Sequence, residues 1–374
     1  MAAFSDLPNE LLYDILQFTL PPDIENLAQT SRRVQEVAGP LLKTHRALIR
    51  KYYSFSLSSD GRADAVSLLQ DILTAPHIAH YVKEAQIDVV EFCSSRRSYT
   101  EEEVGWLCEI AAKSKAVIPD SCPAEVSSLQ FDIRRNKEDA ALGLLLPLLS
   151  NLKTFDMEPW SLYSGDRSWV GQVVCNASIS AAPWFPKLTS VCLWSERRQR
   201  LYHYQRSAQF KHLGLFAALP SVRKLSAREL SDVPGYEEQD TPSLASGVTT
   251  LELEDMHDQV DPKVLCRFLK DLPRLEVCKL STSSHPYRPW KFDASMIKDT
   301  LLATVKTNLR SLTIFGPSGE KCLMGSLRNF EVLVEPRTNW SFLLQDGFSL
   351  QAVLPASLHD LHLKDHEFHR KTKT

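Results

Sequence analysis

The chain has 374 residues with a formal net charge of -3 at pH 7, and 43% of its residues are hydrophobic and 24% charged. This length suggests two domains, or one small domain and one extended array. The slightly negative charge and the absence of a polybasic run argue against general nucleic-acid binding. No apolar run approaches the roughly 20 residues that a membrane-spanning helix needs, and the acidic start does not have the features of a secretion signal. We therefore expect an intracellular protein of the cytoplasm or nucleus.

The first predicted element is an amphipathic helix near the start of the chain. Leu7-Pro8 marks a helix start, because the residue before proline is pushed out of the helical region while proline suits the first turn. Glu10 then lies near the positive end of the helix dipole. The four apolar residues that follow, Leu11, Leu12, Ile15 and Leu16, recur at helical spacing and form one stripe.

Further short helices are predicted up to about residue 53. Pro21-Pro22 ends the first helix, and Asp23 is expected to cap a second helix over residues 24–33. A third is expected from about Arg32 to Gly39-Pro40, and a fourth over residues 41–53. Helices this few and this short cannot bury all their leucines among themselves, so an exposed apolar surface for a partner is expected. The alternative is a helical subdomain that packs on the rest of the chain.

This module resembles an F-box. The stretches LPNELLYDIL and DIENLAQTSRRVQEVAGPLL follow the two halves of the F-box pattern in order, over roughly residues 4–50. One departure is that Val34 and Val37 stand where many F-boxes carry tryptophan. The resemblance implies that the module inserts into the Skp-type adaptor of an SCF ubiquitin ligase, which links it to a cullin and a RING subunit, and that it contributes no catalytic residue. The candidate adaptor-binding residues are Leu7, Pro8, Glu10, Leu11, Leu12, Ile15, Leu16, Leu27 and Arg32.

The rest of the chain carries a recurring apolar pattern. We predict the helical module at 1–53, a polar linker at 54–64, a second domain at 65–366 and a tail at 367–374. Within the second domain an apolar residue recurs at positions i, i+3 and i+5, which is the core of a leucine-rich repeat. The ten segments begin at Val82, Val126, Leu152, Leu188, Val222, Val248, Leu275, Leu309, Leu327 and Leu358.

Helical stretches are expected between these segments, at 137–149, 208–219, 262–272, 293–305 and 342–353. Strands that alternate with helices and return in the same sense form a parallel sheet. The predicted fold class is therefore α/β: a helical F-box followed by an irregular leucine-rich-repeat-like solenoid, with parallel strands on the concave face and helices outside. Residues 68–82 and 354–363 are also similar to the repeat regions of fungal F-box proteins. A non-repetitive α/β domain is the alternative.

In such a solenoid, positions i+2, i+4 and i+6 face the concave side. Aromatic and arginine side chains dominate the energetics of interfaces, so this face is expected to bind a protein substrate. A segment at 158–184 carries Trp160, Trp169 and Trp184, which either fold over this face or belong to the core. The candidate substrate-binding residues are Trp194, Arg197, Arg198, Arg228, Glu252, Glu254 and Lys279.

No motif for catalysis is found in the sequence. It has no P-loop, GxGxxG, HExxH or GxSxG pattern, and we expect neither a catalytic residue nor a cofactor. The eight cysteines are dispersed without a CxxC pair, which favours reduced thiols over disulfides or a zinc site. Four histidines at 359, 362, 366 and 369 raise the possibility of metal binding, but we expect a solvated tail.

Three functional hypotheses follow. The first is a substrate-recognition subunit of an SCF-type ubiquitin ligase. The second is a scaffold that uses the same repeat face without ubiquitination. The third is an α/β enzyme whose N-terminal helices are only structural.

Overall fold

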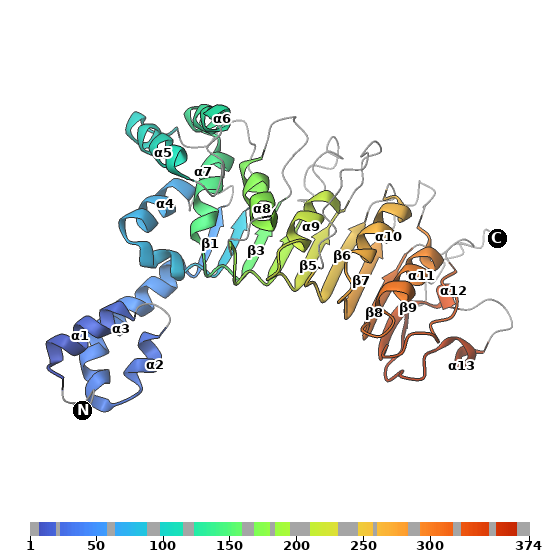
Figure 1. Ribbon diagram of the computed structural model, residues 1–374. Helices are drawn as coiled ribbons and strands as arrows, with labels where there is room; N and C mark the ends of the chain where they lie inside the picture. The colour runs from blue at the N-terminus through green and yellow to red at the C-terminus, as the bar shows by residue number, and fades with distance from the viewer. Residues whose placement is uncertain are drawn as a thin grey trace, which may run out of the picture. The chain divides into compact units, whose positions relative to one another are not determined.

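The computed structural model of the chain forms two compact units (Figure 1). Unit 1 comprises residues 1–156 and 168–188, and unit 2 comprises residues 157–167 and 189–374. The structure describes residues 7–19, 23–57, 64–87, 98–114, 123–158, 168–179, 184–194, 210–230, 246–256, 260–282, 292–316, 323–343 and 349–364.

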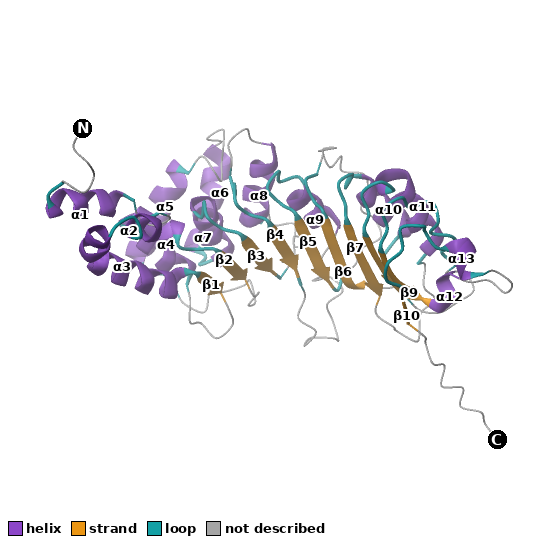
Figure 2. Cartoon of the chain, turned by 90° about the horizontal axis from the view of Figure 1, so that it is seen from below, coloured by secondary structure: helices purple, strands orange, loops and turns teal. Residues whose placement is uncertain are grey.

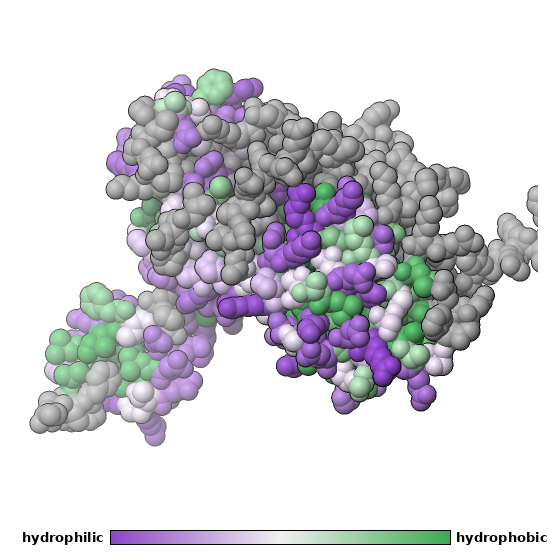
Figure 3. Space-filling model, turned by 45° about the vertical axis from the view of Figure 1, so that its right-hand side comes forward, coloured by the Kyte–Doolittle hydropathy of each residue, from purple (hydrophilic) through white to green (hydrophobic). Residues whose placement is uncertain are grey.

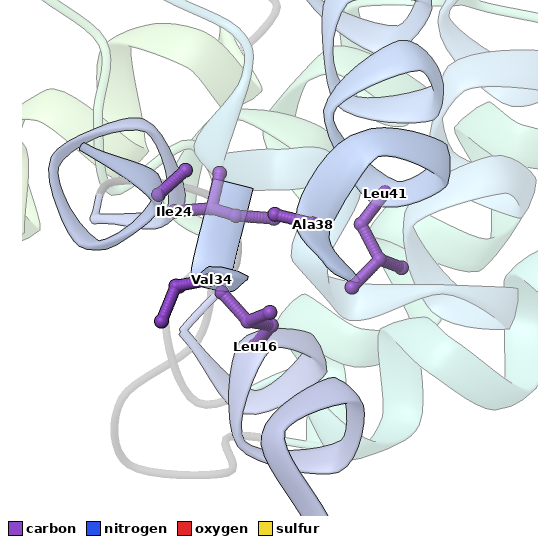
Figure 4. Close-up of a cluster of buried hydrophobic side chains, with 6 residues drawn as sticks. Leu16, Ile24, Val34, Ala38 and Leu41 are labelled. Carbon is purple, nitrogen blue, oxygen red and sulfur yellow. The ribbon is translucent and has the colours of Figure 1, made fainter. Parts of the chain in front are cut away.

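Unit 1 begins with three helices, α1 (Asn9–Phe18), α2 (Ile24–Ala28) and α3 (Arg32–Tyr52). Pro8 stands at the N-cap of α1, as expected from the Leu7-Pro8 start, and the hydroxyl of Ser31 caps α3 by accepting the Val34 N–H at 3.2 Å. The apolar sides of the three helices meet in one cluster (Figure 4). Its buried members are Leu16, Ile24, Ala28, Val34, Ala38 and Leu41.

The expected break at Gly39-Pro40 is wrong, since α3 continues through Pro40 to Tyr52. Proline removes one backbone hydrogen bond and crowds the preceding turn. Pro40 lies on the exposed side of the helix, where the carbonyls of the preceding turn can tilt toward solvent. Ala38 before it and Leu41 after it are both buried. Packing on both sides of the proline therefore holds the two halves in one helix.

The rest of unit 1 alternates helices with three parallel strands in the order β1-β2-β3. Contrary to the linker predicted at 54–64, residues 54–57 form β1, which pairs with β2 and buries Phe55 and Leu57. The elements are β1 (Ser54–Leu57), α4 (Ala65–Thr74), η2 (Pro76–His80), β2 (Glu84–Ile87), α5 (Glu101–Lys113), α6 (Pro123–Arg134), α7 (Glu138–Leu145), η3 (Leu146–Leu148), β3 (Thr154–Met157) and α8 (Trp169–Ile179).

The strand predicted at Val126 is also wrong, because this segment forms α6. Val126, Leu129 and Phe131 follow the repeat spacing, but the fully buried pair is Leu129 and Ile133, four residues apart. That spacing is the helical period. Phe131 lies outside the core with 56% of its surface exposed. The pattern in the sequence was therefore a chance match on an amphipathic helix.

Unit 2 contains parallel strands that follow one another in chain order from β4 to β10. Figures 1 and 2 show α9, α10 and α11 together on one side of these strands. The elements are β4 (Ser190–Leu193), α9 (Phe210–Ala217), β5 (Lys224–Arg228), β6 (Thr250–Met256), α10 (Pro262–Lys270), β7 (Val277–Thr282), α11 (Ala294–Val305), β8 (Ser311–Phe315), β9 (Glu335–Asn339), α12 (Trp340–Leu343), α13 (Leu350–Val353) and β10 (His362–Lys364).

The predicted strands at 188, 222, 248, 275 and 309 correspond to β4 to β8, and their i+3 and i+5 residues are buried, as in Leu251 and Leu253 of β6. The strand predicted at Leu327 is wrong. Leu327 and Phe330 are buried without forming a strand, and β9 begins at Glu335 instead. The helix expected over 342–353 is two short helices, α12 and α13, with residues 344–348 outside the described residues.

Glu138, in the first turn of α7, provides a test of how α4 and α7 pack. Burial, followed by the negative charge of Asp64 at the start of α4, raises the pKa of Glu138 to about 7. Because this folded-state pKa lies above the unfolded value of 4.5, stability falls as the pH rises from about 4.5 to 7. Glu138→Gln is expected to raise Tm by roughly 2 °C at pH 8, since about 1 kcal/mol of this cost is removed, and by less at pH 5.

Scanning calorimetry at pH 5 and pH 8 measures this difference. Glu102→Gln, on the exposed side of α5, is the matched control and should shift Tm equally at both pH values. If Glu138→Gln shifted Tm equally at both pH values, burial would not be raising the pKa of the Glu138 carboxyl.

Candidate adaptor-binding surface and strand face

Helix α1 has two faces with different environments. Leu12 and Leu16, four residues apart, have no exposed surface. The adjacent face carries Leu11, Ile15 and Phe18, which are spaced by four and three residues and therefore lie on one side of the helix. Leu11 is 49% exposed, Ile15 is half-buried and Phe18 is 91% exposed. An apolar stripe with such exposure marks an interaction surface, and we call Leu11, Ile15 and Phe18 the α1 stripe.

Figure 3 shows hydrophobic residues gathered on the surface over these N-terminal helices, at the lower left of the view. The helix that carries the stripe is held at both ends. Thr19 closes the C-terminal end, where its hydroxyl donates to the Leu16 carbonyl at 2.9 Å. At the other end the Arg33 guanidinium donates to the Leu7 carbonyl at 2.7 Å and to the Asn9 side-chain oxygen at 2.9 Å. The stripe is therefore presented on a fixed helix.

The structure divides the predicted adaptor-binding residues into two groups. Leu12 and Leu16 are core residues, and half-buried Leu27 packs against the core cluster. Arg32 is exposed and forms an ion pair with Glu36 at 3.2 Å. The residues with surface available to a partner are Leu7, Pro8, Glu10, Leu11, Ile15 and Arg32.

The sequence interpretation missed two residues of this module. Phe18 lies beyond the end of the recognised motif, and its exposure is visible only in the structure. Arg33 lies in the second half of the F-box pattern, but its hydrogen bonds to Leu7 and Asn9 join positions 26 and 24 residues apart. The sequence offered one signal for Phe18: an aromatic residue that continues the helical apolar spacing at the end of the first helix.

The second candidate site is the side-chain row on the strands of unit 2. Glu252 of β6 lies between two lysines: its carboxylate oxygens are 2.7 Å from Lys224 Nζ on β5 and 2.6 Å from Lys279 Nζ on β7. Burial would raise the pKa of Glu252, but these two charged hydrogen bonds outweigh it, so the pKa lies below its usual value. Arg228 pairs with Glu254 at 3.0 Å. The carboxylates predicted to bind substrate are thus already neutralised by neighbouring strands.

The remaining predicted substrate residues divide as follows. Trp194 is half-buried at the end of β4, and Arg197 and Arg198 lie outside the described residues. Trp169 is a core residue whose indole N–H donates to Asp132 at 2.9 Å, and Trp184 is half-buried. Trp160 lies outside the described residues.

Within the described ranges, no group of three or more His, Cys, Asp or Glu side chains gathers to hold a metal ion. His359 and His362 are exposed, whereas His366 and His369 lie outside the description. No helix within the same ranges combines the length and apolar character needed to cross a bilayer.

These features define a small helical module with an exposed apolar stripe at the start of unit 1, followed in the chain by parallel strands. Residues 4–40 match the family model of the F-box domain. F-box domains bind Skp-type adaptors, so the match implies an adaptor-binding role in SCF ubiquitin ligases for this module. No curated protein matches the chain.

Proposed function

We propose that this chain is a substrate-recognition subunit of an SCF-type ubiquitin ligase and acts without catalysis of its own. The observation that carries the proposal is the α1 stripe, which is exposed on a module that matches the F-box domain. The adaptor, through its cullin and RING subunits, would bring the ubiquitin-carrying enzyme close to whatever the second part of the chain binds. Holding two reactants together in this way raises their effective concentration. This role places the protein inside the cell, in the cytoplasm or nucleus.

We further propose that the second domain is an irregular leucine-rich-repeat-like solenoid that binds a target protein on its strand face. The support is that its parallel strands follow chain order. In β5, for example, Leu225 and Ala227 are buried and alternate with Lys224, Ser226 and Arg228, which keep accessible surface. An array in which each repeat contacts its neighbours leaves one long side-chain face available for a partner.

The adaptor-binding step is tested with the double variant Leu11→Asp plus Phe18→Asp. Both side chains are exposed, so the change should leave the fold intact while placing two charges in an apolar interface. We expect binding of a purified Skp-type adaptor, measured by calorimetry, to weaken by about a hundredfold or more, since truncation of central interface residues costs roughly 2 kcal/mol or more each.

Phe131→Asp on α6 is the matched control, because it introduces a charge at another exposed phenylalanine of unit 1, and it should retain full affinity. If the wild-type chain fails to bind the adaptor, or if the double variant binds as tightly as wild type, the proposal is wrong. The ligase role needs a second measurement: a target whose half-life lengthens when the double variant replaces the wild type. Adaptor binding without such a target would instead favour a scaffold.

A further inference from the structure

Helices α5 and α6 form an additional layer in unit 1. The connection from β2 to β3 contains three helices, whereas the connections from β6 to β7 and from β7 to β8 each contain one described helix, α10 and α11. In Figure 1, α7 lies between this helix pair and the strands β1 and β3, and α5 and α6 pack against each other and contact α7. Insertions between strand repeats are often found at a binding face. The outer side of the pair is therefore a candidate surface for a partner.

Helix α6 has one buried side and one exposed side. Leu129 and Ile133 have no exposed surface and face the interior of unit 1. On the other side Phe131 is 56% exposed. The exposed residues of the turn before it, Ser127 and Ser128, are small. A partner can therefore approach the phenylalanine ring without meeting a bulky side chain from that turn.

Two arginines lie three and four residues after Phe131 and therefore on the same side of the helix. The Arg135 backbone N–H donates to the Phe131 carbonyl at 3.1 Å, and its guanidinium carbon lies 5.4 Å from the centre of the Phe131 ring. Arg134 is exposed as well. Neither arginine forms an ion pair within the part of the chain that the structure describes, and the neighbouring Asp132 already pairs with Lys137 at 2.9 Å. We call Phe131, Arg134 and Arg135 the α6 face.

Folding explains only part of this arrangement. Positive charges in the last turn of a helix interact favourably with the helix dipole, which accounts for the arginines. A cation over an exposed ring adds only about 0.5–1 kcal/mol. Neither effect requires the Phe131 ring to keep more than half of its surface in water. Aromatic residues and arginine are enriched at protein interfaces and carry much of their binding energy, so the α6 face has the composition of an interaction surface.

We propose that the α6 face binds an acidic amphipathic segment of a partner protein. One large apolar residue of the segment packs on Phe131, and its carboxylates pair with Arg134 and Arg135. Charge complementarity selects this occupant, because the two guanidinium groups lie beside the ring without a described carboxylate, and guanidinium can bind a carboxylate through two parallel hydrogen bonds. The inference goes beyond the proposed function, since it uses neither the α1 stripe nor the strand face of unit 2.

The test uses the full chain and three fluorescent peptide pools. The first pool has a central leucine, phenylalanine or tryptophan flanked by random aspartates and glutamates. The second has serine at the centre of the same flanks, and the third keeps the apolar centre but has lysine flanks. Fluorescence anisotropy should show the first pool binding at least about tenfold more tightly than either of the others. Because the whole chain carries a net charge of -3, attraction to an acidic peptide requires a local basic site.

Two variants assign this binding to the α6 face. Phe131→Ser removes the ring without adding a charge and should reduce binding of the first pool to the level of the serine pool. Arg134→Glu plus Arg135→Glu reverses both charges, so it should lose the first pool and gain the lysine-flanked pool. Misfolding would not produce that gain. All three side chains are exposed, so both variants should keep a Tm close to that of the wild type.

The matched control is Lys43→Gln plus Arg50→Gln, which removes two exposed cations from α3 and should bind the first pool as the wild type does. Leu11→Asp plus Phe18→Asp should also bind it unchanged, because the α1 stripe takes no part. A failed adaptor experiment with an intact peptide preference therefore contradicts the proposed function alone, and the reverse result contradicts this inference alone.

Several results would overturn the inference. They are no binding of the first pool, equal binding of the first and third pools, or a Phe131→Ser variant that binds the first pool as tightly as the wild type. Loss of binding in the Lys43 and Arg50 control would place the attraction elsewhere on unit 1. Tighter binding of a mixed-sequence RNA oligonucleotide than of the first pool would assign the α6 face to nucleic acid and would likewise contradict the proposal.

Discussion

Replacing Leu16 with alanine is expected to lower the local stability of the N-terminal helices by about 3 kcal/mol, because it leaves a cavity where a fully buried leucine stood. Leu16 has no exposed surface and belongs to the cluster that joins α1 to α2 and α3, with Ile24 and Val34. A module this small has few other contacts to compensate for the loss. We expect α1 to detach from α3 in a measurable fraction of molecules.

Hydrogen exchange of the α1 amides measures this local opening without assuming that the whole chain unfolds in one step. The matched control is Leu11→Ala, the same substitution on the same helix at a half-exposed position, which should change protection by less than about 0.5 kcal/mol. If both variants lost protection equally, the burial of Leu16 would not be what holds α1.

The two leucines also predict different routes to weakened adaptor binding. Leu11→Ala removes contact area from the α1 stripe but leaves the module folded, so its defect should persist at temperatures where the module is fully folded. Leu16→Ala acts by depopulating the folded module, and its defect should shrink on cooling as the folded fraction rises, because a ligand that binds only the folded form loses apparent affinity in proportion to that fraction. The F-box pattern therefore contains leucines of two kinds: Leu16 stabilises the core of the module, and Leu11 is available to a partner.

Where the sequence predicted the fold well, the signal was local and periodic. The stretches predicted to be helical at 262–272 and 293–305 form α10 and α11, and Asp261 and Asp293 cap these helices. The strands β4 to β8 had apolar residues at both buried positions, at least one of them large. Such patterns need no knowledge of distant residues, which is why they were readable.

The strands that the sequence did not predict, β9 and β1, lack the residue pattern that is typical of a buried strand. The buried residues of β9 are Pro336, Thr338 and Asn339, none of them a large apolar residue, and Pro336 and Thr338 lie beside Leu312 and Ile314 of β8. The β1 strand was hidden by its serines, although Phe55 and Leu57 fill its buried positions. In both cases pairing with a neighbouring strand stabilises the segment. The sequence of the segment alone does not indicate a strand.

The sites show the same division. The motif at residues 7–16 located the docking module, but which of its leucines face outward depends on how α1 packs against α3. The charge on Glu252 was visible in the sequence, whereas its neutralisation depends on Lys224 and Lys279 from two other strands. Contacts of this range are set by the register of the fold and have no local signature.

The other large effect is expected at Asp139, a buried carboxylate in the first turn of α7 that holds the start of α8. Its oxygens accept the backbone N–H of Trp169 at 2.6 Å, the N–H of Val170 at 3.3 Å and the hydroxyl of Ser168 at 3.2 Å. Helix α8 begins at Trp169, so these are N–H groups that have no partner within their own helix. Asp139 on α7 therefore accepts hydrogen bonds from three donors at the start of α8, and the described residues provide no other acceptor for them.

The contact between α7 and α8 is too close to rearrange easily. A Cβ atom added to Gly143 of α7 would lie 2.8 Å from the Trp169 Cβ, so the helices touch one turn beyond Asp139. Asp139→Ala leaves two buried N–H groups and a hydroxyl without an acceptor, and such groups cost about 1–3 kcal/mol each. We expect a total loss of roughly 3 kcal/mol at pH 5, measured by urea unfolding.

The loss should shrink as the pH rises. Burial raises the pKa of Asp139 to about 6 from its usual 3.8, although the hydrogen bonds from Trp169, Val170 and Ser168 oppose the shift. Because the folded-state pKa is the higher one, the wild type loses stability as the pH rises from about 4 to about 6, and the alanine variant has no such dependence. The difference between the two proteins should therefore be about 1 kcal/mol smaller at pH 8 than at pH 5.

Asp139→Asn separates the two contributions, since it keeps one acceptor oxygen without a charge. Its stability at pH 5 should lie between those of wild type and Asp139→Ala, and its difference from the alanine variant should not change with pH. Asp14→Ala, at an exposed position of α1, serves as the control for loss of an aspartate alone. If Asp139→Ala destabilised the chain more at pH 8 than at pH 5, the ionised carboxylate would be a net source of stability, and burial would not control its titration.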